Sequence, residues 1–247
     1  MVDFDVLDDH PAALRDEVTR LFFDHHLILI RGQVLSIQQQ MDFVRWFGEI
    51  RVPSREIHPH LVGTDLSYTY ISNAREDGTG GGNAELVPHQ DYSFADPVGG
   101  IALYALEVPA SGGETGFIDT RRALERLHPH QRQRIQDLEA VHFERFARGE
   151  TPNRVRHPVV LRHPVTGRQS LFVDPLFTES LVGLAPEVGT SLLRELWAAL
   201  EDPALAHWHR WEIGDLIVWD NLVLMHARNV FDADERRTLR RCQFDFA

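Results

Sequence analysis

The first fifty residues carry hydrophobic patterns typical of a helix, a strand and a second helix. Apolar side chains at helical spacing predict an amphipathic helix over residues 11–23. They are Leu14, Val18, Leu21 and Phe22. The apolar run at 27–30 then predicts a short buried strand. Ser36 and Gln39 match a capping box at the start of another apolar pattern, and Gly48 is a plausible end for that second helix.

From residue 66 onward, short apolar or alternating runs are separated by turns rich in Gly, Pro and Ser, which predicts strands. We expect them at 66–72, 85–94, 100–108, 115–119, 141–146, 157–164, 169–174, 208–213, 216–219, 222–227 and 238–246. Helical patterns interrupt them at 120–139, with a break at Pro129, and around 192–200. This order predicts a mainly β fold, a sandwich or jelly-roll barrel with flanking helices, in one domain over 1–247.

Composition narrows the classes of partner. The chain has 247 residues and a formal net charge of -12, so it lacks the excess positive charge that nucleic acid or an anionic membrane surface would require. Its single cysteine, Cys242, cannot form an internal disulfide. The N-terminus lacks a signal-peptide pattern, and no apolar run reaches the ~20 residues of a membrane helix. We therefore expect a cytoplasmic protein without nucleic-acid or membrane partners.

A His-x-Asp pair, His89 and Asp91, lies within one predicted strand. Alternate side chains of a strand share a face, so the pair presents one nitrogen and one oxygen ligand to a common point. This is half of a metal site or, equally, a polar pair on a solvated strand face.

A third ligand would have to come from a distant strand. His226 ends an apolar run that follows the turn dipeptide Asp220-Asn221, and it is either that ligand or a histidine packed in the core. Several other histidines, such as His26, lie at helix ends or in loops, where surface placement is usual, and His163 flanks a turn.

Two of the arginines after His226 are candidates for binding an anion: Arg237, directly before the last predicted strand, and Arg241, within it. Arg237 and Arg241 share a strand face, and a buried guanidinium requires an anion such as a carboxylate. A charged edge strand with solvated arginines is the alternative.

In order and spacing, the segments HQD, PASGGETGFID, WDNLVLMHARN and RRTLRR resemble the taurine dioxygenase/2,4-dichlorophenoxyacetate dioxygenase family of Fe(II)- and 2-oxoglutarate-dependent oxygenases. The resemblance runs from about residue 20 to the C-terminus and implies a double-stranded β-helix, the jelly-roll of the clavaminate synthase-like type. It implies that three side chains ligate iron: His89, Asp91 and His226. It also implies that Thr115 and Arg237 hold the distal carboxylate of 2-oxoglutarate, and that Arg241 lies near the substrate or the other end of the co-substrate.

The resemblance further implies hydroxylation of an unactivated C–H bond with release of succinate and CO2. Arg241 favours a small polar or anionic metabolite, such as an amino acid, as the substrate. Asp91 favours hydroxylation over halogenation, because related halogenases have a small residue there. A desaturase or ring-forming enzyme on the same site is one alternative, and a non-catalytic jelly-roll protein that binds a small molecule is another. The partners would be dioxygen and the small-molecule substrate, and a homo-oligomer is compatible with the sequence.

The sequence names further candidates around such a site. Asn73, Ser93 and Phe177 are candidate substrate contacts together with Arg241, and Tyr92 is the weakest of these candidates. Trp219 and Asn221 are expected to serve core packing and turn geometry. The glycine-rich stretch 73–85 is either a flexible connection or a lid.

Overall fold

The computed structural model describes residues 5–6, 10–52, 67–73, 82–146 and 152–246. Its larger sheet is antiparallel, has six strands and runs in the order β1, β13, β5, β15, β2, with β3 also paired to β15. The bounds are β1 Leu27–Ile30, β13 Leu216–Asp220, β5 Gly100–Glu107, β15 Thr238–Phe246, β2 Gly48–Ile50 and β3 Thr69–Ser72.

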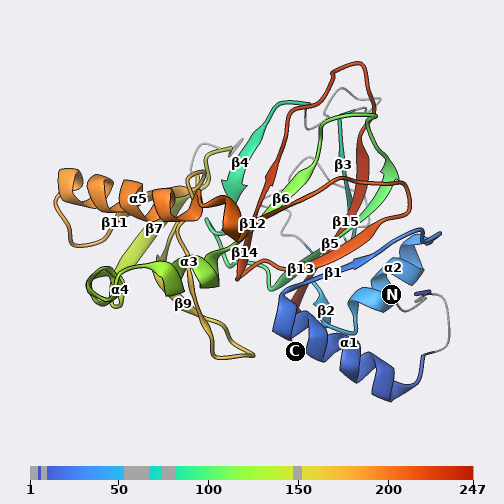
Figure 1. Cartoon of the computed structure of the whole chain (residues 1–247), viewed down its shortest axis with the longest axis horizontal. Helices are drawn as coiled ribbons and strands as arrows, with labels where there is room; N and C mark the ends of the chain where they lie inside the picture. The colour runs from blue at the N-terminus through green and yellow to red at the C-terminus, as the bar shows by residue number, and fades with distance from the viewer. Residues whose placement is uncertain (1–4, 7–9, 53–66, 74–81, 147–151, 247) are drawn as a thin grey trace.

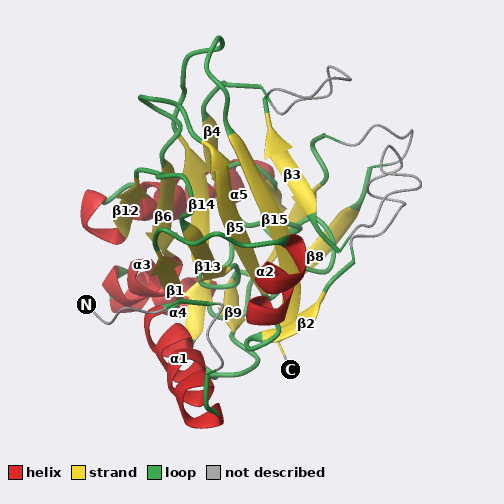
Figure 2. Ribbon diagram, turned by 90° about the vertical axis from the view of Figure 1, so that its right-hand side faces the viewer, coloured by secondary structure: helices red, strands yellow, loops and turns green. Residues whose placement is uncertain are grey.

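A second antiparallel sheet has four strands in the order β12, β6, β14, β4. The bounds are β12 Ala206–His209, β6 Thr115–Asp119, β14 Leu224–Arg228 and β4 Leu86–His89. Figures 1 and 2 show this sheet facing the six-stranded one. Sequence neighbours β13 and β14 belong to opposite sheets, so the turn between them carries the chain across the sandwich.

One hydrophobic core fills the space between the two sheets. The six-stranded sheet contributes Ile101, Leu103 and Trp219, and the four-stranded sheet contributes Phe117 and Leu224. Strands with both faces buried explain the near-continuous apolar runs at 100–106 and 216–219 in the sequence.

Helices cover the outer faces of both sheets. The helices α1 (Ala12–His25) and α2 (Ile37–Val44) pack on the six-stranded sheet, against side chains such as Tyr104 and Phe244. On the far side of the four-stranded sheet lie α3, α4 and α5 (Figure 1). Their bounds are α3 Thr120–Arg126, α4 Pro129–Ile135 and α5 Pro186–Leu200, and a 3-10 helix, η2, spans Pro203–Leu205.

Two smaller sheets complete the described structure. One has the order β11, β7, β8 and the other pairs β10 with β9. The bounds are β7 Glu139–Phe143, β8 Arg154–Pro158, β9 Val160–Arg162, β10 Gln169–Leu171 and β11 Thr178–Leu181. The β9–β10 hairpin turns at residues 163–168, where the sequence has the predicted Pro-Val-Thr-Gly turn.

The mainly β jelly-roll with flanking helices is confirmed. The capping box of α2 is present, because Ser36 accepts a hydrogen bond from the Gln39 backbone and the Gln39 side chain accepts one from Ser36. The predicted end at Gly48 is wrong: α2 ends at Val44, and Gly48 begins β2, packed against the backbone of Asp245. Within the described residues, no helix has both the length and the apolarity to cross a bilayer.

Part of one predicted feature falls outside the described residues. The stretch 73–85 includes residues 74–81, which the structure does not describe, so the lid stays a prediction. The single-domain organisation over 1–247 also stays a prediction.

Candidate functional site

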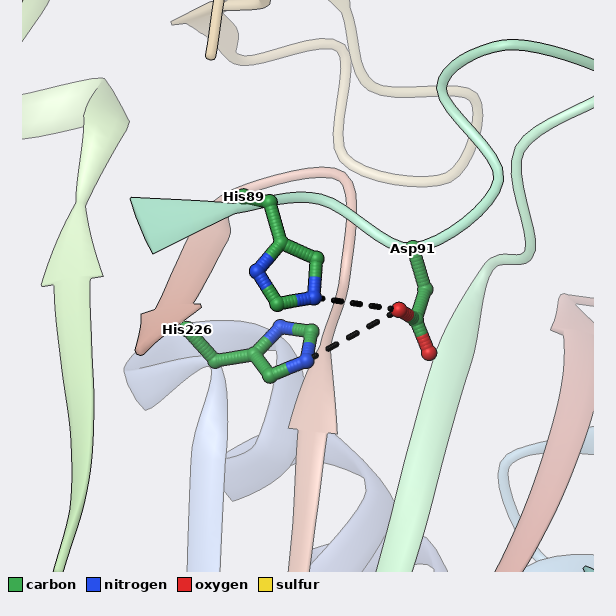
Figure 3. Close-up of side chains that lie close together, drawn as sticks. All are labelled: His89, Asp91 and His226. Atoms are coloured by element: carbon green, nitrogen blue, oxygen red, sulfur yellow. Dashed lines mark ion pairs between the residues drawn. The ribbon is translucent and has the colours of Figure 1, made fainter. Parts of the chain in front are cut away.

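Two histidines from neighbouring strands meet in the four-stranded sheet. His89 is the last residue of β4, and His226 lies opposite it in β14. Their ring centroids are 4.1 Å apart. The Nε2 atoms of His89 and His226 lie 3.4 Å and 3.8 Å from Oδ1 of Asp91 (Figure 3). Ligand atoms from all three residues lie within 4.8 Å of one another, close enough to share a metal ion.

Asp91 reaches this point by a route that the sequence pattern does not predict. The strand ends at His89, and residues 91–94 form a turn, so His89 and Asp91 do not share a strand face. The next residue, Tyr92, has φ 61°, a left-handed conformation that residues other than glycine rarely adopt. The predicted convergence is therefore present, but a turn rather than strand alternation produces it.

Electrostatics keep Asp91 and His226 ready to bind a cation. Burial acts to lower the pKa of His89, but Asp91 outweighs it and raises that pKa. Burial acts to raise the pKa of Asp91, but His89, His226 and Arg241 outweigh it and hold that pKa well below its usual range. Burial and the neighbouring His89 lower the pKa of His226 to about 3, so its imidazole is neutral at physiological pH. An ionised carboxylate beside a neutral imidazole is the protonation state that metal ligands require.

The donor set fits an Fe(II) ion. His89 donates a hydrogen bond from Nδ1 to the carbonyl oxygen of Val87, over 3.0 Å, which makes Nε2 the ring nitrogen that faces Asp91 and can bind a metal when it is deprotonated. Two imidazoles and one carboxylate on one side of a cation are typical of non-haem iron centres that keep open positions. Among the described residues, this is the cluster whose ligand atoms lie close enough to hold a metal.

A cavity connects this cluster to a buried cation. Its walls include the three clustered side chains and, deeper in the barrel, Thr115 and Arg237. Arg237 is 3% exposed and donates to the Gly113 carbonyl and to Oγ1 of Thr115. Gly113 has φ 67°, and a Cβ there would lie 3.1 Å from Cδ of Arg237, so the Gly-Gly turn lets the arginine pass.

No carboxylate of the described residues forms an ion pair with Arg237. Burial and the neighbouring Arg228 lower the pKa of Arg237 to about 9, which leaves it protonated at neutral pH. A buried guanidinium without a counter-anion is costly, and a ligand carboxylate would relieve that cost. The surroundings of Arg237 therefore fit the distal carboxylate of a keto-diacid.

The neighbouring arginines of β15 face opposite ways. Arg241 faces the cavity, where its Nη1 lies 3.0 Å from Oδ2 of Asp91 and its Nε donates to Thr69. Arg240 faces outward and donates to Gln40 of α2. The predicted common face of Arg237 and Arg241 is confirmed, and the solvated edge strand is wrong because β3 and β5 flank β15.

The candidate substrate contacts lie in different environments. Asn73 accepts a hydrogen bond from the Arg237 backbone and donates to the Glu235 carbonyl, so it supports the buried arginine. Ser93 is fully buried and donates to Asp174. Phe177 packs edge-on against His89, with centroids 5.8 Å apart. Of these three, Phe177 contacts a residue of the metal cluster, and all three substrate roles stay predictions.

Sequence reasoning missed one charged residue of the cavity. Arg228 lies two residues after His226 on the same face of β14 and pairs directly with Thr115 of β6. Its Nε is buried without a hydrogen-bond partner in the described structure. The alternation His226-x-Arg228 is the signal that could have indicated a third guanidinium in this cavity.

Comparisons with known proteins agree with this geometry. The family described as "Taurine catabolism dioxygenase TauD, TfdA family" matches residues 1–243. The chain belongs to this family. It is 35% identical over 246 residues to pentalenolactone F synthase of Streptomyces arenae, a match that covers 88% of this chain and 82% of that protein.

Two further relatives bear on the cofactors of the family. The chain is 32% identical over 250 residues to the alpha-ketoglutarate-dependent 2,4-dichlorophenoxyacetate dioxygenase of Cupriavidus pinatubonensis, covering 91% of this chain and 86% of that protein. The crystal structure of AAD-2 with Mn(II) and N-oxalylglycine superposes with a TM-score of 0.84 and 25% identity, covering 100% of this chain and 94% of that one. This chain is accordingly an Fe(II)- and 2-oxoglutarate-dependent dioxygenase (alpha-ketoglutarate is 2-oxoglutarate), and the substrates of the family are small molecules oxidised with dioxygen.

Proposed function

We propose that this enzyme hydroxylates an unactivated C–H bond of a small anionic molecule. The reaction consumes 2-oxoglutarate and dioxygen and releases succinate and CO2, with one oxygen atom in the new hydroxyl group and the other in succinate. The observation that carries the proposal is one cavity that holds both the His89–Asp91–His226 cluster and the buried cation of Arg237, which forms no ion pair with a described carboxylate.

In this proposal each residue of the cavity has a defined task. His89, Asp91 and His226 hold Fe(II), which, together with 2-oxoglutarate, supplies the activation of dioxygen. Arg237 and the hydroxyl of Thr115 bind the distal carboxylate of 2-oxoglutarate and thereby orient its keto acid end toward the metal cluster. The barrel walls exclude water from this end of the cavity.

The substrate is proposed to bind between Arg241 and an aromatic wall. Two nitrogens of Arg241 have partners, and within the described residues Nη2 has none, so it can bind an anionic group beside the metal. Phe177 lies against His89, and Phe94 packs against Phe177 with centroids 4.8 Å apart. These rings favour a substrate with an apolar body, and 2,4-dichlorophenoxyacetate, named for one relative, combines such a body with a carboxylate.

The names of the relatives support a second candidate reaction on the same site. One of them is a synthase named for its product, pentalenolactone F. Desaturation or ring formation would use the same ligands and differ after removal of the substrate hydrogen. Product mass distinguishes them, since hydroxylation adds one oxygen atom and desaturation removes two hydrogen atoms.

The test measures succinate formation with Fe(II), ascorbate and 2-oxoglutarate over a panel of small carboxylates and sulfonates. Asp91→Ala should lose this activity, and the exposed Asp96→Ala, which removes an aspartate paired with Arg51, should retain it. Arg237→Met should raise the KM for 2-oxoglutarate by about 10- to 100-fold, because a charge-assisted pair is lost. An Asp91→Ala variant with normal succinate formation would contradict the proposal.

A further inference from the structure

The three side chains of the metal cluster are not supported in the same way. His89 and His226 are paired residues of adjacent strands, so the sheet fixes both backbones. Asp91 lies beyond the end of β4 and has no strand partner. Its position must therefore come from other contacts, and these contacts decide whether the carboxylate meets the two imidazoles.

The side chain of Asn221 takes the place of a strand partner for Asp91. Its Oδ1 accepts a hydrogen bond from the Asp91 backbone N–H over 2.9 Å, and its Nδ2 donates to the Asp91 carbonyl over 3.0 Å. Nδ2 also donates to the Val98 carbonyl over 3.1 Å, at the far end of the same loop. One amide thus satisfies both backbone groups of Asp91, as a neighbouring antiparallel strand would.

The hydrogen bonds from the Asn221 side chain to Asp91 and Val98 form a clamp on this loop, and Gln90 adds to the clamp from the opposite direction. Its Nε2 donates to the carbonyls of Asn221 and Leu222, each over 3.2 Å. The backbone N–H of Asn221 donates to the Gly99 carbonyl over 2.9 Å. Gln90 and Asn221 are both fully buried, so water cannot replace these bonds if they are removed.

The clamp opposes a local strain. Tyr92, directly after Asp91, has φ 61°, and such conformations persist where the surroundings over-determine them. Without the Asn221 amide, the 91–94 turn could relax away from this conformation and carry the carboxylate of Asp91 out of line with the imidazoles. Arg241 would still hold Oδ2 of Asp91, so the carboxylate would remain ionised while its direction changed.

We propose that Asn221 and Gln90 are positioning residues that aim the Asp91 carboxylate at the metal. This inference rests on the proposed role of Asp91 as a ligand. Loss of the Asn221 amide should weaken metal binding by about 10- to 100-fold, the range found when partners of metal ligands are removed. Gln90→Met should have a smaller effect in the same direction, since the Gln90 side chain bonds to the carbonyls of Asn221 and Leu222 and not to Asp91 itself.

The experiment compares four variants of the full chain: Asn221→Ala, Gln90→Met, Asp91→Ala and Ser170→Ala. Ser170 is the matched control, because it is buried and donates to the Leu222 carbonyl of the same turn without contacting Asp91. The Kd for Mn(II) is measured from the EPR signal of free Mn(II), and the geometry of the site from the visible spectrum of bound Co(II). Thermal unfolding of each metal-free variant records stability separately.

The expected result is a raised Kd and an altered Co(II) spectrum for Asn221→Ala, a smaller rise for Gln90→Met, and wild-type values for Ser170→Ala. If Asp91→Ala binds Mn(II) as wild type does, the proposed function fails. If Asp91→Ala loses Mn(II) while Asn221→Ala and Gln90→Met bind it like Ser170→Ala, only the positioning role fails. If Asn221→Ala does not fold, the Kd of Gln90→Met decides: a Kd above that of Ser170→Ala supports the positioning role, and an equal Kd contradicts it.

Discussion

Two buried clusters in this protein each combine two histidines with one aspartate, and their surroundings differ. In the first, the side chains of His89, Asp91 and His226 are 5%, 15% and 13% exposed, and they border a cavity. In the second, Asp220 is fully buried, with Oδ2 lying 3.0 Å from Nδ1 of His26 and 3.0 Å from Nε2 of His163. The residue types are identical, so composition does not decide which cluster can hold a metal.

In the second cluster, both carboxylate oxygens of Asp220 already have partners within the described structure. Both imidazoles face one oxygen of Asp220, and the other oxygen accepts a hydrogen bond from the Leu222 N–H. Nδ1 of His163 accepts from the backbone of Val165 and Thr166, which places its proton on Nε2, toward Asp220. Burial acts to raise the pKa of Asp220, but the two histidines lower it below its ordinary value. This cluster joins the end of α1, the β9–β10 turn and β13, so its effect is on stability.

Replacing a histidine by phenylalanine should therefore lower activity but not stability in the first cluster, and lower stability but not metal binding in the second. His226→Phe should lower succinate formation by at least about 100-fold, because losing a ligand exceeds the loss of a ligand's partner. Its melting temperature without metal should stay equal or rise, since Nδ1 of His226 is buried without a partner and the ring lies against Trp219. Calorimetry and the succinate assay measure the two effects, and a folded, fully active variant would break the comparison.

His163→Phe should instead lower the free energy of unfolding by about 1–3 kcal/mol, because Asp220 loses one partner in a buried site. The backbone N–H groups of Val165 and Thr166 also lose their acceptor. Urea unfolding measures the loss, and the Mn(II) Kd of the folded variant should match wild type. A raised Kd would show that the two clusters are coupled through the turn at 221–223.

Another buried histidine, His142, sharpens the contrast, because its pKa is lowered although Asp174 lies nearby. Burial and His157 lower the pKa of His142 to about 3, and its Nδ1 is 3.8 Å from Asp174. Below pH 6.5 the unfolded chain binds a proton that folded His142 does not, so this residue lowers stability by about 2 kcal/mol between pH 6.5 and pH 5.

Asp174 acts in the opposite direction, because burial raises its pKa to about 6 and the folded state takes up that proton first. The difference between wild type and His142→Phe isolates the contribution of the histidine. Urea unfolding at pH 6.5 and pH 5 should give a smaller acid-induced loss for His142→Phe than for wild type. Equal losses would mean that His142 becomes protonated in the folded state.

The smallest expected effect concerns the charge of the cavity beside the first cluster. Arg228→Met should raise the Kd for 2-oxoglutarate by about 2- to 5-fold, as expected for a partly exposed cation acting without a bidentate contact. An anaerobic titration of the Fe(II)–2-oxoglutarate absorption band provides the Kd. An unchanged Kd would limit Arg228 to its contacts with the Ala84 carbonyl and the Phe231 ring.

Local patterns predicted most of the fold, and the family resemblance identified the residues of the first cluster. The helix at 12–25, the capping box at Ser36 and the break at Pro129 follow from signals within a few residues, which act before distant contacts form. The expected surface position of His26 is wrong, because α1 ends against β13 and buries that ring. A residue at a helix end is usually exposed, so the sequence predicts exposure for His26. The residue is buried only because α1 packs against a strand that is distant in the sequence.

The chain's residue types and their order determined the chemistry that is available: two imidazoles, a carboxylate, a hydroxyl and several guanidiniums at recognisable spacings. The tertiary structure decided which histidines and which aspartate face a cavity and which pair with one another in the core. It also decided that Asp91 arrives from a turn held by Asn221, a residue 130 positions away. The physical reason is that ligand geometry depends on contacts between segments far apart in the chain, and no local pattern encodes their distances.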